Sequence, residues 1–184
     1  PMDPKEDLKK VESYLENSKT KGDPSRGAAL FASAKLACVS CHRLSQKGGQ
    51  VGPELDKLNT CLSPMQVVES VLWPQKEVKP EFRAWAVTTS NGRIIQGYIE
   101  KETAKTLSIK EATTQKVLDL PAEEIEEKKQ VGSLMPANLL DSLNEGEKND
   151  LFAFLLTLGS DRFHPEWMKG HGHVAKLVET KFPP

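Results

Sequence analysis

One five-residue motif, Cys38-Val39-Ser40-Cys41-His42, sets tighter limits on the fold and chemistry of this chain than any other feature. Two thiols three residues apart, followed at once by a histidine, have the spacing of covalent haem attachment. The thiols of Cys38 and Cys41 would add to the vinyl groups on one edge of the porphyrin, and His42 would then ligate the iron. The motif therefore predicts one covalently bound haem c.

A Cys-x-x-Cys pair also occurs in zinc sites and in redox-active dithiols. A tetrahedral zinc site needs two further ligands, and Cys61 is the only other cysteine of the chain. A thioredoxin-like dithiol would follow a strand, whereas residues 26–37 are predicted to be helical. Asp23 can cap that helix, with Pro24 at its first position. The sequence therefore favours haem attachment over both alternatives.

The second axial ligand of a low-spin haem iron is most often Met or His. Met135 lies in the non-periodic run Ser133-Leu134-Met135-Pro136, whose proline ends regular structure. Such a loop suits a ligand that crosses the distal face, so Met135 is the predicted sixth ligand; a loop methionine that caps the core is the alternative. Met65 instead shares a helical stripe with Val68 and Leu72, and we expect it to pack in the core.

The segment between the two predicted ligands has the pattern of a β-sheet. Segments that alternate between apolar and polar residues and are rich in β-branched residues flank Asn91-Gly92. Asn-Gly between such segments is the strongest short signal for a hairpin. The predicted elements are strands at 82–88, 93–99, 106–110 and 116–120, followed by an acidic helix at 122–129. This unit would serve as a rigid spacer, or as a surface or lid that docks a partner. Beyond it, Asn144 and Glu147 form a capping-box signal for a final helix at 145–158.

A helix that runs into the haem motif, followed by the loop Gly52-Pro53, resembles class I c-type cytochromes. In that family the carbonyl of the loop proline accepts the proton of the axial histidine's second nitrogen. The resemblance therefore implies that Pro53 orients His42. A plain turn is the alternative for this loop.

Over residues 23–160 the chain also resembles the Planctomycetes/Verrucomicrobia-type putative haem-binding domain. That family is known mostly from sequence and is often fused to dehydrogenase-like β-propeller domains, so the resemblance implies electron transfer without naming a substrate. The matching elements are 27–31, Cys38 to His42, 51–55, 68–74, 88–92, Gly97, 133–136 and the final helix.

The expected fold is mainly α, a class I cytochrome c-like helical haem domain interrupted by a small antiparallel β insertion. The expected parts are an N-terminal helical extension (1–22), the haem domain (23–79 and 130–160), the β-rich insertion (80–129) and a histidine-containing tail (161–184). In the tail, His164, His171 and His173 resemble histidines that precede haem motifs in multihaem cytochromes, which suggests an excised module of a longer protein. A chance surface tail and a transition-metal site are the alternatives.

The predicted function is electron transfer rather than catalysis, with a redox partner protein or a fused dehydrogenase or multihaem module as partner. One alternative is a haem enzyme or a gas or redox sensor, peroxidase-like, with an open or labile sixth position. Another is an interaction module in which the β insertion binds a partner and the haem only stabilises the fold. The 25 basic and 26 acidic residues disfavour nucleic-acid binding, and no apolar run approaches the length of about 20 residues that spans a bilayer.

Covalent haem attachment takes place outside the cytoplasmic membrane, where the thiols meet the delivered haem. We therefore expect a periplasmic or otherwise exported protein, in a mature or trimmed form because residues 1–6 lack the apolar segment of a secretion signal. Cys61 remains as a spare cysteine. We expect it to be a small buried hydrophobe, with a free thiol or an intermolecular disulfide as the alternatives.

Overall fold

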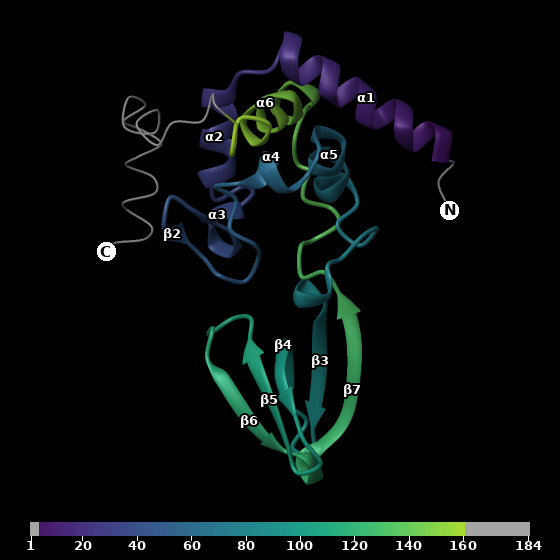
Figure 1. Ribbon diagram of the computed structural model, residues 1–184, viewed down its shortest axis with the longest axis vertical. Helices are drawn as coiled ribbons and strands as arrows, with labels where there is room; N and C mark the ends of the chain where they lie inside the picture. The colour runs from purple at the N-terminus through teal and green to yellow at the C-terminus, as the bar shows by residue number, and fades with distance from the viewer. Residues whose placement is uncertain (1–3, 161–184) are drawn as a thin grey trace. The chain divides into compact units, whose positions relative to one another are not determined.

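The computed structural model describes residues 4–160 of the 184-residue chain. These residues divide into two compact units (Figure 1). Each unit has its own hydrophobic core. A helical unit contains the chain up to Trp73 and again from Ala137, and a β unit contains Pro74 to Pro136. The β unit thus begins before and ends after the insertion at 80–129 that the sequence suggested.

The helical unit is built around two crossing helices, α2 and α6, and α1 packs against both α6 and α5 (Figure 1). Its core contains the aromatic pairs Tyr14–Phe152 and Phe31–Phe154, with ring centroids 5.0 Å and 5.5 Å apart. The elements are α1 (Pro4–Thr20), α2 (Pro24–Ala32), α3 (Cys38–Cys41), β1 (Arg43–Leu44), β2 (Lys47–Gly48), α4 (Leu58–Cys61), α5 (Pro64–Leu72) and α6 (Glu145–Leu155).

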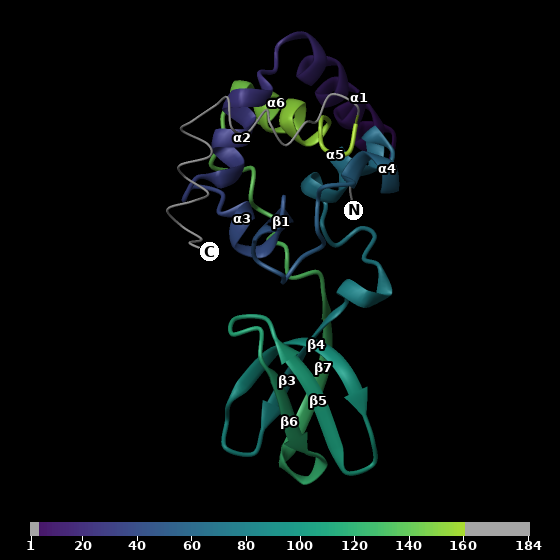
Figure 2. The ribbon, with the colours of Figure 1, turned by 60° about the vertical axis from the view of Figure 1, so that its left-hand side comes forward.

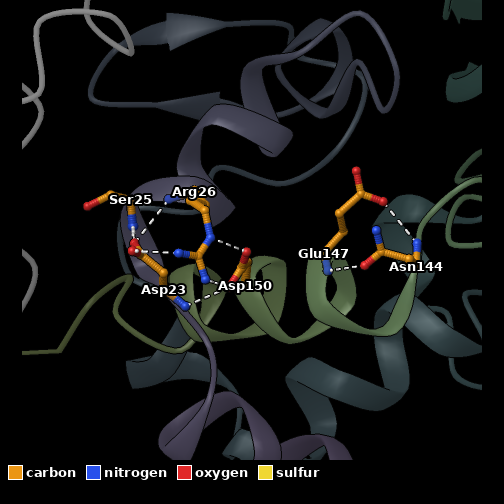
Figure 3. Close-up of polar contacts among 6 residues, drawn as sticks. All are labelled: Asp23, Ser25, Arg26, Asn144, Glu147 and Asp150. Carbon is orange, nitrogen blue, oxygen red and sulfur yellow. Dashed lines mark hydrogen bonds and ion pairs between the residues drawn. The ribbon is translucent and has the colours of Figure 1, made fainter.

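Local capping signals in the sequence determine where these helices begin. The Asp23 carboxylate accepts hydrogen bonds from the backbone N–H groups of Ser25 and Arg26 at the start of α2. At the start of α6, Asn144 and Glu147 form a reciprocal capping box (Figure 3). The helix starts predicted after Asp23 and Asn144 are therefore confirmed, although α2 already ends at Ala32.

A buried carboxylate joins the start of α2 to the middle of α6. The Asp150 side chain is only 8% exposed and accepts from Arg26 Nε at 2.7 Å and from Arg26 Nη2 at 2.9 Å (Figure 3). It also accepts from the backbone N–H of Asp23 at 2.7 Å. These charge-assisted bonds fix α2 on α6, and residues 33–37 connect α2 to the cysteine motif.

The β unit is a single five-stranded antiparallel sheet, drawn from a second side in Figure 2, and its strand order β6-β5-β4-β3-β7 can be followed in Figure 1. Four strands follow one another as a meander, and β7 returns through a 3-10 turn, η2, to pair with β3. The bounds are η1 (Pro80–Phe82), β3 (Ala84–Thr89), β4 (Ile94–Glu102), β5 (Thr106–Glu111), β6 (Val117–Pro121), η2 (Ala122–Glu124) and β7 (Ile125–Gly132). The core of the sheet contains Val87, Ile95, Leu107, Ile109 and Leu120.

The prediction of a mainly α, class I cytochrome c-like fold is wrong. The structure has 37% helix and 25% strand, and the β unit forms a complete sheet with its own core. Part of the error lies at residues 122–129, which were expected to form an acidic helix. Glu and Lys favour helices by local propensity, but Ile125–Gly132 pairs with β3 along its length, and this tertiary pairing prevails.

The four strands predicted from alternation are confirmed as β3 to β6, and the Asn91-Gly92 hairpin joins β3 to β4, with Thr89 N–H donating to the Arg93 carbonyl at 2.9 Å. Within residues 4–160, no helix is long and apolar enough to cross a membrane.

Candidate functional site

The cysteine motif forms a single helical turn, α3, immediately after a backbone reversal at Ala37. Ala37 has a positive φ of 51°, and its carbonyl accepts from the Ser40 N–H at 2.9 Å. The turn is closed by the His42 N–H, which donates to the Cys38 carbonyl at 2.9 Å. Because residues three apart lie on the same side of a helix, Cys38 and Cys41 belong to one face of this turn.

The chain after His42 folds back over the motif and is held there by backbone hydrogen bonds. A two-residue turn, with positive φ of 49° at Ser45 and 65° at Gln46, connects β1 to β2. The returning loop then donates three N–H groups to the motif region: Gly49 to Val39 at 2.9 Å, Gly52 to Cys41 at 2.8 Å, and Leu55 to Arg43 at 3.0 Å. The motif and residues 49–55 therefore form one bonded substructure.

The loop at residues 49–55 fixes the imidazole of His42. The Nδ1 atom of His42 lies 2.9 Å from the carbonyl oxygen of Pro53. A carbonyl can only accept, so Nδ1 carries the proton and Nε2 keeps its lone pair. Burial lowers the pKa of His42, and the bond to Pro53 only partly opposes this effect. Near neutral pH the ring is therefore uncharged and has the tautomer that a metal ligand at Nε2 requires.

Gly52 lies against the face of the same ring. A Cβ built at this position would be 2.5 Å from His42 Cε1, 2.8 Å from Nδ1 and 3.0 Å from Nε2. No side chain fits in this space without moving the imidazole. The loop thus orients His42 by a hydrogen bond from Pro53 and by close backbone contact from Gly52.

The two thiols are unpaired, and their surroundings disfavour the thiolate form. Cys38 is partly buried, Cys41 is more exposed, and neither forms a disulfide. Burial raises the pKa of the Cys38 thiol to about 12 and also raises the pKa of Cys41. A redox dithiol depends on a lowered pKa, because the thiolate is the nucleophile. The electrostatics of this pair therefore do not favour the dithiol alternative.

The part of the chain that the structure describes brings together no group of three or more His, Cys, Asp or Glu side chains that could hold a metal ion. The zinc alternative thus finds no further ligands for Cys38 and Cys41 there. Cys61 is exposed, at the end of α4, and has a free thiol. The expectation that Cys61 is a buried hydrophobe is wrong, because the last residue of this one-turn helix faces away from the core.

The predicted methionine ligand lies in the β unit, two residues before the chain returns to the helical unit at Ala137. Met135 is half-buried, and its backbone N–H donates to Ser133 Oγ at 3.1 Å. Met65 is 38% exposed on α5, so the expectation that it packs in the core is wrong. On that helix Val67 and Val68 supply the buried face instead. His164, His171 and His173 lie outside the described residues.

These observations fit a covalently held haem. The motif provides two unpaired thiols on one helical turn, and the following residue is a histidine whose Nδ1 bonds to Pro53, so Nε2 is the nitrogen that could bind iron. No family model matches this chain, and no curated protein matches its sequence. The resemblance to the haem-binding family therefore stays a prediction.

Sequence reasoning missed two features of this region. One is the set of backbone bonds between the motif and the loop at residues 49–55, which no local pattern encodes. The other is Gln75, whose side-chain amide bonds to both backbone groups of Ser133, next to the methionine loop. A single glutamine after Trp73-Pro74 carries no recognisable signal in the sequence.

Proposed function

We propose that this chain is a c-type cytochrome module that carries one covalent haem and acts in electron transfer. Cys38 and Cys41 would hold the haem by thioether bonds, and His42 and Met135 would be the axial ligands of the iron. The observation that carries the proposal is geometric: the Nδ1 of His42 lies 2.9 Å from the Pro53 carbonyl oxygen, and His42 directly follows a pair of unpaired thiols. The proposal concerns the chemistry of the site and does not depend on a mainly helical fold.

When bound, the haem would supply a one-electron couple between ferric and ferrous iron. Pro53 keeps the proton on the distant nitrogen of His42, so the ligating nitrogen needs no deprotonation before it binds iron. The Pro53 carbonyl also increases the basicity of the ring, which is the usual effect of such a partner on a histidine ligand. The loop thereby sets both the orientation and the donor strength of His42.

A thioether ligand from Met135 would complete the coordination of the iron. If His42 and Met135 both bound the iron, no coordination site would be left for a substrate, which is why we favour a carrier over a peroxidase-like enzyme or a gas sensor. A carrier needs a partner that gives or takes electrons, and a redox protein or a fused dehydrogenase or multihaem module fits this role. Covalent attachment further implies an exported, periplasm-like location.

The absorption spectrum of the oxidised, haem-loaded protein tests this assignment. We expect a sulfur-to-iron charge-transfer band that Met135→Ala abolishes and that Met65→Ala, at an exposed position on α5, leaves unchanged. A five-coordinate, high-spin spectrum of the unaltered protein that responds to peroxide or carbon monoxide would contradict the carrier assignment. A band that disappears in Met65→Ala and persists in Met135→Ala would move the ligand to Met65.

A further inference from the structure

A single glutamine joins the segment that enters the β unit to the segment that leaves it. Gln75 Nε2 donates to the Ser133 carbonyl at 2.7 Å, and the Ser133 N–H donates to Gln75 Oε1 at 2.9 Å. The side-chain amide therefore bonds to both backbone groups of one residue, as a neighbouring β-strand would. We call these two bonds the Gln75 clasp.

The backbone at the end of β7 is shaped to admit this amide. Gly132 has a positive φ of 79°, and a Cβ built there would clash with Gln75 Oε1. The positive φ favours glycine at this position, and a Cβ there would displace the Gln75 amide. Strand β7 pairs with β3 up to Gly132, which lies opposite Ala84. The clasp thus bonds Ser133, the residue that follows the last paired residue of β7, so the backbone stays hydrogen-bonded for one residue beyond the strand.

A further hydrogen bond connects Ser133 to Met135. The Ser133 hydroxyl accepts from the backbone N–H of Met135 at 3.1 Å, which forms a short side-chain turn. An uninterrupted series of hydrogen bonds therefore runs from Gln75 through Ser133 to Met135. All three residues belong to the β unit.

We propose that Gln75 is a positioning residue for the axial ligand Met135, an inference that rests on the ligation proposed above. A flexible loop loses conformational entropy when its methionine binds iron, and this cost weakens the binding of the methionine to the iron. The clasp fixes the backbone two residues before Met135 in advance, so less freedom remains to be lost. Removing the clasp lowers the fraction of protein in which the loop is ready to ligate.

The test measures how strongly Met135 holds its position against a competitor. Imidazole is titrated into the oxidised, haem-loaded protein, and loss of the sulfur-to-iron charge-transfer band gives its apparent Kd. In Gln75→Ala the apparent Kd should fall by about threefold to tenfold, which is roughly the net effect of one typical hydrogen bond, because both bonds of the clasp are solvent-exposed. Gln96→Ala removes an exposed glutamine of β4 in the same unit and should leave the apparent Kd unchanged.

A second measurement does not depend on the haem. Hydrogen exchange of the Ser133 amide should accelerate in Gln75→Ala, because its acceptor Oε1 is gone, and should remain slow in Gln96→Ala. Ser133→Ala provides an independent variant: it retains the bonds between Gln75 and the backbone but removes the acceptor of the Met135 N–H. It should lower the apparent Kd for imidazole by a smaller factor than Gln75→Ala.

The possible outcomes separate the two proposals. If the unaltered protein shows no charge-transfer band, the ligation by Met135 is wrong, whatever Gln75 does. If the band is present and disappears in Met135→Ala, but neither Gln75→Ala nor Ser133→Ala changes the apparent Kd for imidazole, Met135 is the ligand and the positioning role of Gln75 is wrong. A faster-exchanging Ser133 amide with an unchanged Kd would show that the clasp exists and does not affect ligation, which also overturns the inference.

Discussion

The Nδ1 atom of His42 lies 2.9 Å from the carbonyl oxygen of Pro53, across a loop that is itself bonded to the cysteine motif. This bond assigns the proton to Nδ1, and burial keeps the ring neutral by lowering its pKa. The geometry is set by backbone atoms, because the acceptor is a carbonyl and the loop is held through the N–H groups of Gly49, Gly52 and Leu55. Side-chain changes at Pro53 are therefore a weak probe, and changes at Gly52 are a strong one.

Gly52→Ala should disturb the orientation of His42, because the new methyl group would lie 2.5–3.0 Å from three atoms of the imidazole ring. We expect a shifted reduction potential or a lower yield of haem-loaded protein, measured by electrochemistry and by haem content per chain. Gly146→Ala in the first turn of α6 is the control, since its Cβ meets only Asn144 Oδ1, at 3.2 Å, far along the chain from the motif. Equal behaviour of the two variants would contradict the role of Gly52.

Asp23 should make the stability of the protein depend on pH in the acid range. The N–H groups of Arg26 and then Ser25 lower the pKa of Asp23 below its usual 3.8, with burial acting in the opposite direction. The charged form is therefore favoured in the folded state. Its contribution to stability is complete above pH 3.8 and is lost as the pH falls through the lower folded value.

Two substitutions separate the cap from the charge of Asp23. Asp23→Ala should lower the free energy of unfolding by about 1 kcal/mol at pH 7, the usual cost of losing an N-cap. Asp23→Asn keeps a side-chain oxygen that can cap α2, but the amide does not ionise. The loss of stability that Asp23 causes below about pH 4 should therefore disappear in this variant. Urea unfolding at pH 7 and at pH 3 measures both effects. An acid loss in Asp23→Asn as large as in the unaltered chain would contradict this assignment.

Asp150→Ala should destabilise the helical unit by about 2 kcal/mol, because it leaves the Asp23 N–H without its acceptor and breaks the paired bonds from Arg26. Urea unfolding, followed by the circular dichroism signal of the α-helices, measures the loss. Glu100→Ala, at an exposed position on β4, is a matched removal of a carboxylate from a surface. It should change the stability by less than about 0.5 kcal/mol. A loss in Asp150→Ala no larger than in this control would show that the network does not hold α2 on α6.

Signals confined to a few neighbouring residues were predictable from the sequence. Asp23-Pro24 and the pair Asn144 and Glu147 mark helix starts that the structure contains, and Asn91-Gly92 marks the hairpin between β3 and β4. Each signal works through hydrogen bonds or dihedral preferences within four residues, so no knowledge of the distant chain is needed.

Features that depend on distant partners were not predictable. Residues 125–132 are rich in Glu and Lys and look helical, yet they form the strand β7 because β3 offers a complete set of backbone partners. The mistaken mainly α fold follows in part from this segment. Met65 matches the helical stripe but lies at its edge, where Val67 and Val68 already fill the core.

The candidate site shows the same division. The motif at Cys38 to His42 can be recognised from five consecutive residues. The orientation of the His42 ring, by contrast, depends on the loop at residues 49–55, which folds back and bonds to the motif region. The bond from His42 to Pro53 was expected only through a resemblance, and its geometry is now visible. Gln75 lies 58 residues from the Ser133 that it holds, and nothing in either local sequence links the two.

The central claim is that Cys38 and Cys41 hold a haem covalently. The intact mass of the protein, produced with the haem-attachment machinery of an exporting cell and measured under denaturing conditions, tests this claim most directly. We predict the mass of the polypeptide plus one haem, and the mass of the polypeptide alone for the double variant Cys38→Ala/Cys41→Ala. A denatured chain that carries no added mass, or that carries the haem equally in the double variant, would contradict the account.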